Sequence, residues 1–90
     1  MNEQQAREAI AVWAKRHYAE DGLDAPAVEV ISPTYDRLHA WWQAEVITTT
    51  SAGMQHACVT FWRNEVGILC VGVEWEDAYG QETTHMRPVE

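Results

Sequence analysis

The sequence predicts an α+β fold, with an N-terminal helix packed on one face of a four- or five-stranded antiparallel meander sheet. Residues 3–20 carry apolar side chains at three- and four-residue spacing, which is typical of a helix with one buried face. From residue 27 onward, runs rich in Val, Ile, Thr and Trp alternate with short turn segments, as in an antiparallel sheet. No linker, repeat or low-complexity segment interrupts the 90 residues, so we expect a single domain spanning 1–90.

The predicted helix has recognisable signals at both ends. Asn2 can cap its start, with Gln5 three residues later as the partner in a capping box. Gly22 followed by Leu23 predicts a Schellman ending, in which glycine adopts the left-handed conformation. The apolar stripe consists of Ala6, Ile10, Trp13, Ala14 and His17. This stripe must face a core, where His17 would be either a hydrogen-bonded core residue or a group that titrates near neutral pH.

The predicted strands are bounded by proline, glycine and polar turn residues. Their ranges are 27–31, 38–50, 54–63, 66–75 and, for a fifth strand, 81–87. Ser32-Pro33 ends the first strand, because proline lacks the N–H group that a central strand donates. Short loops at 51–53, 64–65 and 76–80 connect the later strands.

Loop length predicts the register of the central strands, and the register decides which side chains share a face. A three-residue loop at 51–53 places Trp42 opposite Trp62. A two-residue loop of Asn64 and Glu65 fixes the next pair of strands in the same way. Because side chains alternate along a strand, one mostly apolar set is expected beneath the helix. That set is Leu38, Ala40, Trp42, Ala44, Val46, Cys58, Thr60, Trp62, Leu69, Val71, Val73 and Trp75.

The opposite sheet face is predicted to be a partner-binding surface. One helix covers one face only, so the aromatic and aliphatic side chains on the other face would stay in water. The predicted binding residues are Trp41, Gln43, Glu45, Ile47, Phe61, Arg63 and Glu74. An apolar patch with a polar rim is typical of an interface. The alternative is that Trp41 and Phe61 merely cover each other, with Arg63 lying over Trp41 as a cation–π cap.

The charge of the chain restricts its partners. The sequence has 6 Lys and Arg against 14 Asp and Glu, a net charge of -8, which argues against direct binding to nucleic acid and favours a partner with a basic surface. Clustered acids are predicted to steer that partner: Glu20, Asp21, Asp24, Glu29, Glu76, Asp77 and Glu82. The alternative is a solvated acidic surface that only keeps the protein soluble. Without an apolar run long enough for a bilayer or a secretory signal, we expect no membrane contact and a cytoplasmic location.

No motif in the sequence identifies a reaction, a metal or a cofactor. His56-Ala57-Cys58 does not have the ligand spacing of a zinc site, and no Cys, His or carboxylate set forms a catalytic signature. Cys58 and Cys70 are expected to be free thiols, because the predicted register points their side chains to opposite faces. We therefore assign no catalytic residue, no metal ligand and no cofactor, and expect a protein that is not an enzyme.

Arrangement and composition suggest a class of function. A helix followed by a curled antiparallel sheet resembles the cystatin-like and NTF2-like group, and this resemblance implies pairing through sheet faces or a ligand held between helix and sheet. The small, acidic, Trp-rich composition resembles that of bacterial immunity proteins and of phage-encoded inhibitors such as anti-CRISPR proteins. We expect a non-enzymatic inhibitor or immunity-type module that occludes the surface of a larger protein, for example one that binds nucleic acid. The alternatives are a ligand-binding or enzymatic pocket lined by Trp13, Trp42, Trp62 and His17, and a homodimer formed through the sheet face.

Overall fold

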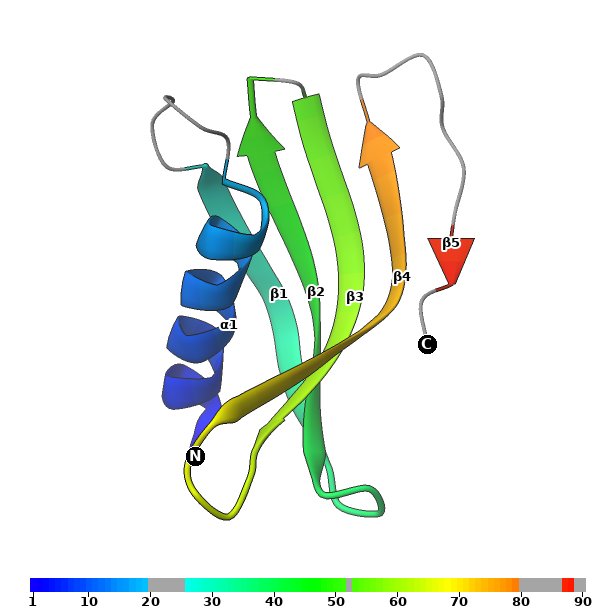
Figure 1. Cartoon of the computed structure of the whole chain (residues 1–90). Coiled ribbons are helices and arrows are strands. Elements are labelled where there is room, and N and C mark those ends of the chain that lie inside the picture. Colours follow the sequence, from blue (N-terminus) through cyan, green and yellow to red (C-terminus); the bar gives the residue numbers. More distant parts are fainter. Residues whose placement is uncertain (20–25, 52, 80–86, 89–90) are drawn as a thin grey trace.

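The computed structural model describes residues 1–19, 26–51, 53–79 and 87–88, and its fold is the α+β arrangement that the sequence predicts (Figure 1). Its elements are α1 (Glu3–His17), β1 (Ala27–Asp36), β2 (Trp41–Thr50), β3 (Gly53–Arg63), β4 (Leu69–Tyr79) and β5 (Arg87–Pro88). The strands form one antiparallel sheet in the order β1-β2-β3-β4-β5. Most of the predicted fifth strand lies outside the described residues.

The predicted capping box of α1 is confirmed. The Asn2 side chain accepts a hydrogen bond from the Gln5 backbone N–H at 2.8 Å, and the Gln5 side chain accepts one from the Asn2 backbone N–H at 2.9 Å. The helix ends earlier than predicted, at His17, with Tyr18 as its C-cap. The predicted Schellman ending at 22–23 lies outside the described residues. Basic side chains occupy the last turn of α1, which suits the negative end of the helix dipole.

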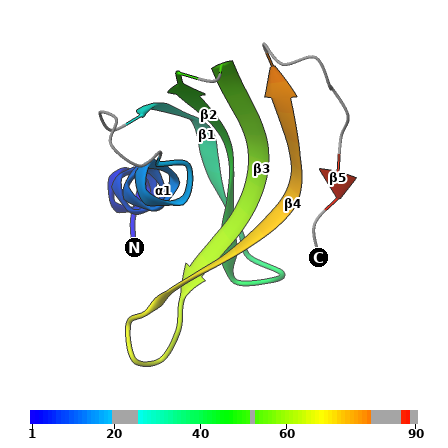
Figure 2. The same cartoon turned by 45° about the horizontal axis from the view of Figure 1, so that its top comes forward.

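The buried face of α1 is narrower than predicted. Ala6, Ile10 and Ala14 are fully buried, as the periodicity predicts. Trp13 is half-buried, and His17 is exposed and stacks on the Trp13 ring with centroids 4.7 Å apart. The prediction that His17 belongs to the core-facing stripe is therefore wrong. The helix lies on the concave side of the bent sheet and packs chiefly against β1 and β2 (Figure 2).

The first strand continues through the proline that was predicted to end it. β1 reaches Asp36, with Pro33 buried and a register shift between Ile31 and Thr34. Ser32 has a φ of 49°, so the chain bulges where the proline enters. β1 is an edge strand, and an edge strand with a bulge tolerates a residue that cannot donate a ladder hydrogen bond.

The register between β2 and β3 differs from the predicted one by one residue. Thr50 pairs with Gly53 and Trp42 pairs with Phe61, so the connecting loop is shorter than predicted. Gly53 has a φ of 123° and is the first residue of β3, so the glycine that was assigned to the loop takes part in strand pairing. A slip of one residue turns every side chain of a strand to the other face. The prediction that placed Trp62 beneath the helix is therefore wrong.

The β3–β4 connection, in contrast, is longer than the predicted two residues. Arg63 pairs with Leu69, and the Asn64 side chain closes the loop by accepting hydrogen bonds from the backbone N–H groups of Val66 at 3.0 Å and Ile68 at 2.9 Å. The connection has five residues instead of two, and this odd difference reverses the alternation of β4 relative to β3. Because β3 is itself reversed relative to the prediction, the two changes cancel, and Leu69, Val71 and Val73 face the helix as predicted.

Strand β4 continues to Tyr79, through residues that were predicted to form a turn. A register shift opposite Cys58 and Val59 inserts one extra residue into β4, so that Cys58 pairs with Trp75 while Val59 pairs with Val73. This bulge turns Trp75 away from the helix, contrary to the prediction, and bends the strand.

The core forms between α1 and the concave face of the sheet. Its buried apolar residues are Ala6, Ile10, Ala14, Val30, Ala44, Val46, Ala57, Val59 and Phe61. Six residues predicted for this face lie elsewhere. Leu38 is 86% exposed and Ala40 is exposed in the turn that connects β1 and β2, while the outer face of the sheet holds Cys58, Thr60, Trp62 and Trp75. Among the described residues, no helix has the length and hydropathy of a membrane span.

Candidate functional site

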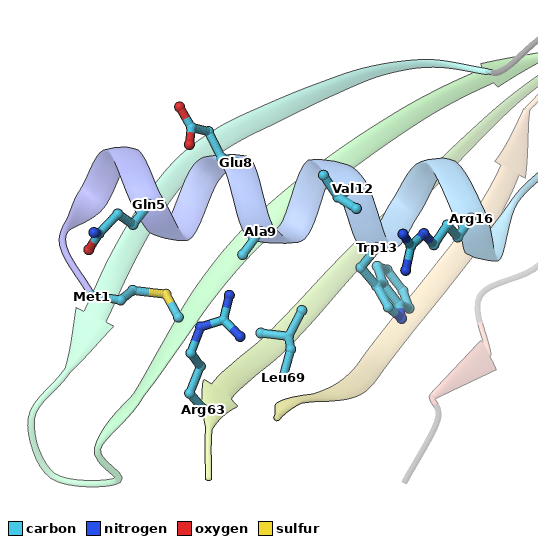
Figure 3. Close-up of a pocket in the computed structure, with 9 residues that line it drawn as sticks. All are labelled: Met1, Gln5, Glu8, Ala9, Val12, Trp13, Arg16, Arg63 and Leu69. Atoms are coloured by element: carbon cyan, nitrogen blue, oxygen red, sulfur yellow. The ribbon is translucent and has the colours of Figure 1, made fainter. Parts of the chain in front are cut away.

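The candidate site is the outer face of the sheet, which is the side turned away from α1. Its ring-bearing side chains are Trp41, His56, Trp62 and Trp75 from the strands and His39 from the β1–β2 turn. Its carboxylates are Glu29, Asp36, Glu45, Glu74 and Asp77. Arg63 is the one Lys or Arg residue in β1–β4, and it lies on the helix side (Figure 3). The outer face of these four strands thus combines indole rings with negative charge.

The rings on the outer face form two contact groups. His39 stacks on Trp41 with ring centroids 4.5 Å apart and an interplanar angle of 11°, and Trp41 contacts Trp62 at 6.1 Å. Further along β3, His56 meets Trp75 edge-on at 4.9 Å. The Trp41 Nε1 atom is buried and has no acceptor in the described part of the chain. Ring contacts, and not a hydrogen bond from the indole nitrogen, therefore hold Trp41 in place.

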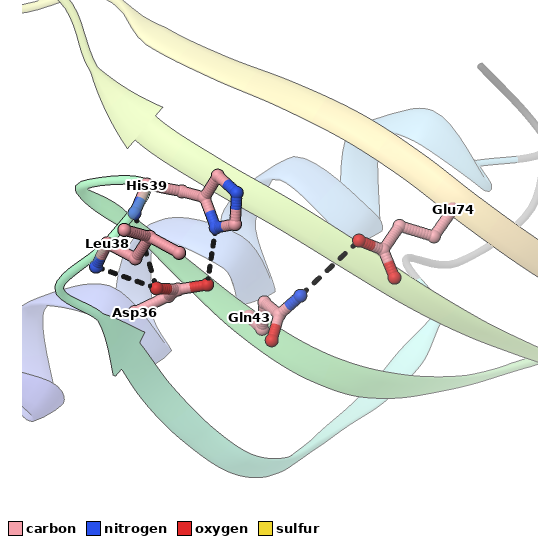
Figure 4. A network of polar contacts seen from close by, with 5 residues as sticks. All are labelled: Asp36, Leu38, His39, Gln43 and Glu74. Atoms are coloured by element: carbon pink, nitrogen blue, oxygen red, sulfur yellow. Dashed lines mark hydrogen bonds and ion pairs between the residues drawn. The ribbon is translucent and has the colours of Figure 1, made fainter.

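Asp36 positions the ring that covers Trp41 (Figure 4). One carboxylate oxygen of Asp36 accepts hydrogen bonds from the backbone N–H groups of Leu38 at 2.9 Å and His39 at 3.3 Å, and the other lies 2.8 Å from His39 Nδ1. The hydrogen bond with the His39 ring, supported by the backbone N–H groups, lowers the pKa of Asp36 below its usual value. Asp36 therefore keeps its negative charge at neutral pH while it orients His39.

Glu74 and Glu45 make the centre of the outer face electronegative. Gln43 Nε2 donates to Glu74 at 3.3 Å, Cys58 Sγ lies 3.7 Å from the same carboxylate, and His56 Nε2 lies 3.9 Å from Glu45. Burial, followed by the negative charge and hydrogen bonding of Glu74 and the negative charge of Glu45, raises the pKa of the Cys58 thiol to about 11. The negative charge of the outer face therefore contributes to the raised pKa of the Cys58 thiol.

This field predicts the reactivity of Cys58. We expect Glu74→Gln to increase the rate at which iodoacetamide alkylates Cys58 at pH 8 by about two- to tenfold, because loss of the charge lowers the thiol pKa and raises the thiolate fraction. The site-resolved rate is measured by mass spectrometry of the digested protein, with the exposed Glu65→Gln as the control, which should leave the rate unchanged. An unchanged rate in Glu74→Gln would contradict the assigned electrostatics.

The predicted binding residues divide between the two faces. Trp41, Gln43, Glu45, Ile47 and Glu74 lie on the outer face, where they were expected. Phe61 is 0% exposed and packs in the core, and Arg63 lies beside the helix, so the prediction was wrong for both. The one-residue error in the β2–β3 register explains both misplacements.

The β2–β3 register error hid two residues of the site, and the β4 bulge hid a third. Trp62 and Cys58 were assigned beneath the helix but lie on the outer face, and Trp75 joins them because of the β4 bulge. With Cys70 opposite Trp62, both cysteines belong to the outer face, contrary to the prediction that they diverge; both are free thiols. The pairing depends on Gly53, which opens β3, although a glycine at this point of the sequence suits a loop equally well.

The predicted steering acids that the structure describes lie on both sides of the sheet. Glu29 and Asp77 lie on the outer face, opposite Ile47 and His56 respectively. Glu76 is on the helix side, where its carboxylate accepts a hydrogen bond from the Tyr18 hydroxyl at 3.0 Å. Burial and this carboxylate raise the pKa of Tyr18 far above its usual value. The remaining acids of that prediction, Glu20, Asp21, Asp24 and Glu82, lie outside the described residues.

A groove of about 740 Å³ opens on the other side of the sheet, between α1 and the ends of β3 and β4 (Figure 3). Its lining residues are Met1, Gln5, Glu8, Ala9, Val12, Trp13, Arg16, Arg63 and Leu69. Of the residues predicted to line a pocket between helix and sheet, Trp13 is present in this lining, whereas Trp62 lies on the opposite face.

Comparisons with known protein families, with curated proteins and with solved structures find no match to this chain. In the part of the chain that the structure describes, no group of three or more His, Cys, Asp or Glu side chains is arranged to hold a metal ion. The outer face and the groove are therefore the two candidate binding surfaces in the described part of the chain.

Proposed function

We propose that this protein is a binding module that docks through its outer sheet face onto a basic surface of a larger protein. The observation that carries the proposal is the segregation of charge: carboxylates and indole rings share the outer face of β1–β4, while Arg63 is on the helix side. Carboxylates attract Lys and Arg, and indole rings bind the same cations through their faces, at about 0.5–2 kcal/mol for each contact.

The proposed mode of action is occlusion. A module with a net charge of -8 associates rapidly with a basic surface and then blocks access of that surface to its other ligands, nucleic acids included. This role requires no catalytic group and no direct contact with nucleic acid. Inhibition of a nucleic-acid-binding protein is the form of occlusion that this charge favours. The free thiols Cys58 and Cys70 support a cytoplasmic site of action.

A homodimer through the outer face is less favourable on electrostatic grounds. Face-to-face pairing of two copies would bring Glu45, Glu74 and Asp77 of one copy against the same carboxylates of the other. Like charges at an interface oppose association, unless other groups neutralise them. The acidic character of this face therefore favours a basic partner over a second copy of the chain.

Octa-arginine is a defined probe for the proposed surface. We expect it to bind the wild-type protein at low ionic strength, with an affinity that falls about tenfold or more as salt is raised, because the interaction is electrostatic. The double variant Glu45→Gln/Glu74→Gln should bind about three- to tenfold more weakly in isothermal titration calorimetry. Neither substitution disturbs the core, because both side chains are exposed.

A matched control distinguishes the effect of removing charge from the outer face from the effect of lowering the total charge of the protein. Glu3→Gln/Glu65→Gln removes the same charge from exposed sites away from the outer face, at the helix start and in the β3–β4 loop. We expect the control to change the octa-arginine affinity by less than about twofold. Equal losses in the two double variants would contradict the proposal, since octa-arginine would then be sensing only the total charge.

A further inference from the structure

The groove between α1 and the ends of β3 and β4 has a chemistry opposite to that of the outer face. Its apolar lining comes from Ala9, Val12, Trp13 and Leu69, and Val12 is 48% exposed although it is a large aliphatic residue on a helix. A groove of about 740 Å³ is within the range, about 300–1,000 Å³, of sites that hold small molecules.

Two arginines supply positive charge to this groove. Arg63 points from β3 toward the helix, and Arg16 lies beside the Trp13 ring (Figure 3). Arg63 Nη1 donates to the Gly67 carbonyl oxygen at 2.9 Å, which holds the guanidinium near Leu69 while leaving its other N–H groups available. No carboxylate among the described residues forms an ion pair with either arginine.

The acidic residue in the lining does not cancel this charge. Glu8 points away from Arg63 and Leu69 (Figure 3), and its carboxylate accepts a hydrogen bond from Gln4 Nε2 at 2.9 Å. A chain with a net charge of -8 thus places two guanidinium groups, neither of them in an ion pair with a carboxylate of the described residues, beside an apolar surface. Such a combination complements a molecule that has an apolar body and an anionic head.

We infer that this groove binds a medium-chain carboxylic acid, with the alkyl chain against Val12, Trp13 and Leu69 and the carboxylate beside Arg63. The inference does not depend on the proposed function, because the groove and the outer face lie on opposite sides of the sheet. The arginines select the anion, and the apolar lining selects a chain over a small inorganic ion.

Octanoate tests this site, with octan-1-ol as the neutral ligand of matched chain length. We expect octanoate to bind saturably with a dissociation constant of about 0.1–1 mM. Amide and indole resonances of Ala9, Val12, Trp13 and Leu69 should shift in two-dimensional NMR spectra. Octan-1-ol should bind at least about threefold more weakly, because it cannot pair with the guanidinium groups.

Variants at two exposed positions test where the alkyl chain and the carboxylate of the ligand lie. Val12→Glu should weaken octanoate binding more than Val12→Gln, because both variants remove apolar surface and the glutamate also repels the carboxylate. Arg63→Met should weaken octanoate about threefold or more and leave octan-1-ol unchanged, with Arg37→Met in the β1–β2 turn as the control.

Three outcomes would overturn the inference. Octanoate that fails to saturate by about 10 mM would show that the groove is not a carboxylate site. Equal affinity for octan-1-ol would show that the arginines do not select the ligand. Shifts centred on Trp41 and Trp62 would place binding on the outer face.

Discussion

Replacing Phe61 by alanine should lower the free energy of unfolding by about 3–5 kcal/mol. The Phe61 ring is 0% exposed, and its loss leaves a cavity between the sheet and α1 that the surrounding core cannot fill completely. This change is a large fraction of the stability of a small domain, about 5–15 kcal/mol. Urea denaturation followed by circular dichroism measures it. Phe61→Leu, which keeps most of the volume, should lose less than Phe61→Ala and stay folded.

The neighbouring tryptophan is the matched control for that experiment. Trp62 lies one residue further along β3 but is half-buried on the outer face. We expect Trp62→Ala to cost about 1–2 kcal/mol, which reflects lost ring contacts with Trp41 and partial burial. A larger loss for Trp62→Ala than for Phe61→Ala would contradict the assigned faces.

Replacing Trp41 by alanine should weaken octa-arginine binding about tenfold. Trp41 is the ring that links His39 and Trp62, so its removal disperses the aromatic surface on which a guanidinium group can stack. We expect a modest loss of stability as well, about 1–2 kcal/mol, because the ring is half-buried and contacts two others.

Trp13→Ala is the control for the Trp41 experiment, because it removes an indole from the groove side of the sheet. Calorimetric titration of both variants compares the two faces directly. We expect Trp13→Ala to leave octa-arginine binding within about twofold of wild type. A folded Trp41→Ala protein that binds octa-arginine as tightly as wild type would remove Trp41 from the proposed site.

Features specified by nearby residues could be predicted from the sequence. The capping box of Asn2 and Gln5 and the burial of Ala6, Ile10 and Ala14 depend on the helix alone, and the structure confirms them. The order and antiparallel direction of the first four strands follow from short connections between β-rich runs.

The features that depend on strand pairing could not be predicted from the sequence with the same accuracy. Gly53 is compatible both with a loop and with the first position of a strand, and this one choice determined whether Phe61 or Trp62 entered the core. The β4 bulge that turns Trp75 outward and the β1 bulge that accommodates Pro33 have no unique local signal. Burial against α1 selects among these alternatives, and such burial is a property of the assembled fold.

The candidate surface was therefore predicted in part. Trp41, Gln43, Glu45 and Ile47 were assigned correctly, because the orientation of β2 is set by the apolar residues that alternate with them and pack toward α1. The side chains of β3 were all assigned to the wrong face of the sheet. The corrected face has more indole rings and no strand arginine from β1–β4, which strengthens the argument for a basic partner.

The assignment of side chains to the two faces of the sheet is the claim on which the account rests, and nuclear Overhauser effects between β2 and β3 test it most directly. We predict cross-strand contacts between Ala44 and Val59 and between the Trp41 and Trp62 rings. Contacts between Ala44 and Thr60, with the Trp62 ring against α1, would contradict the register and with it the acidic, aromatic outer face.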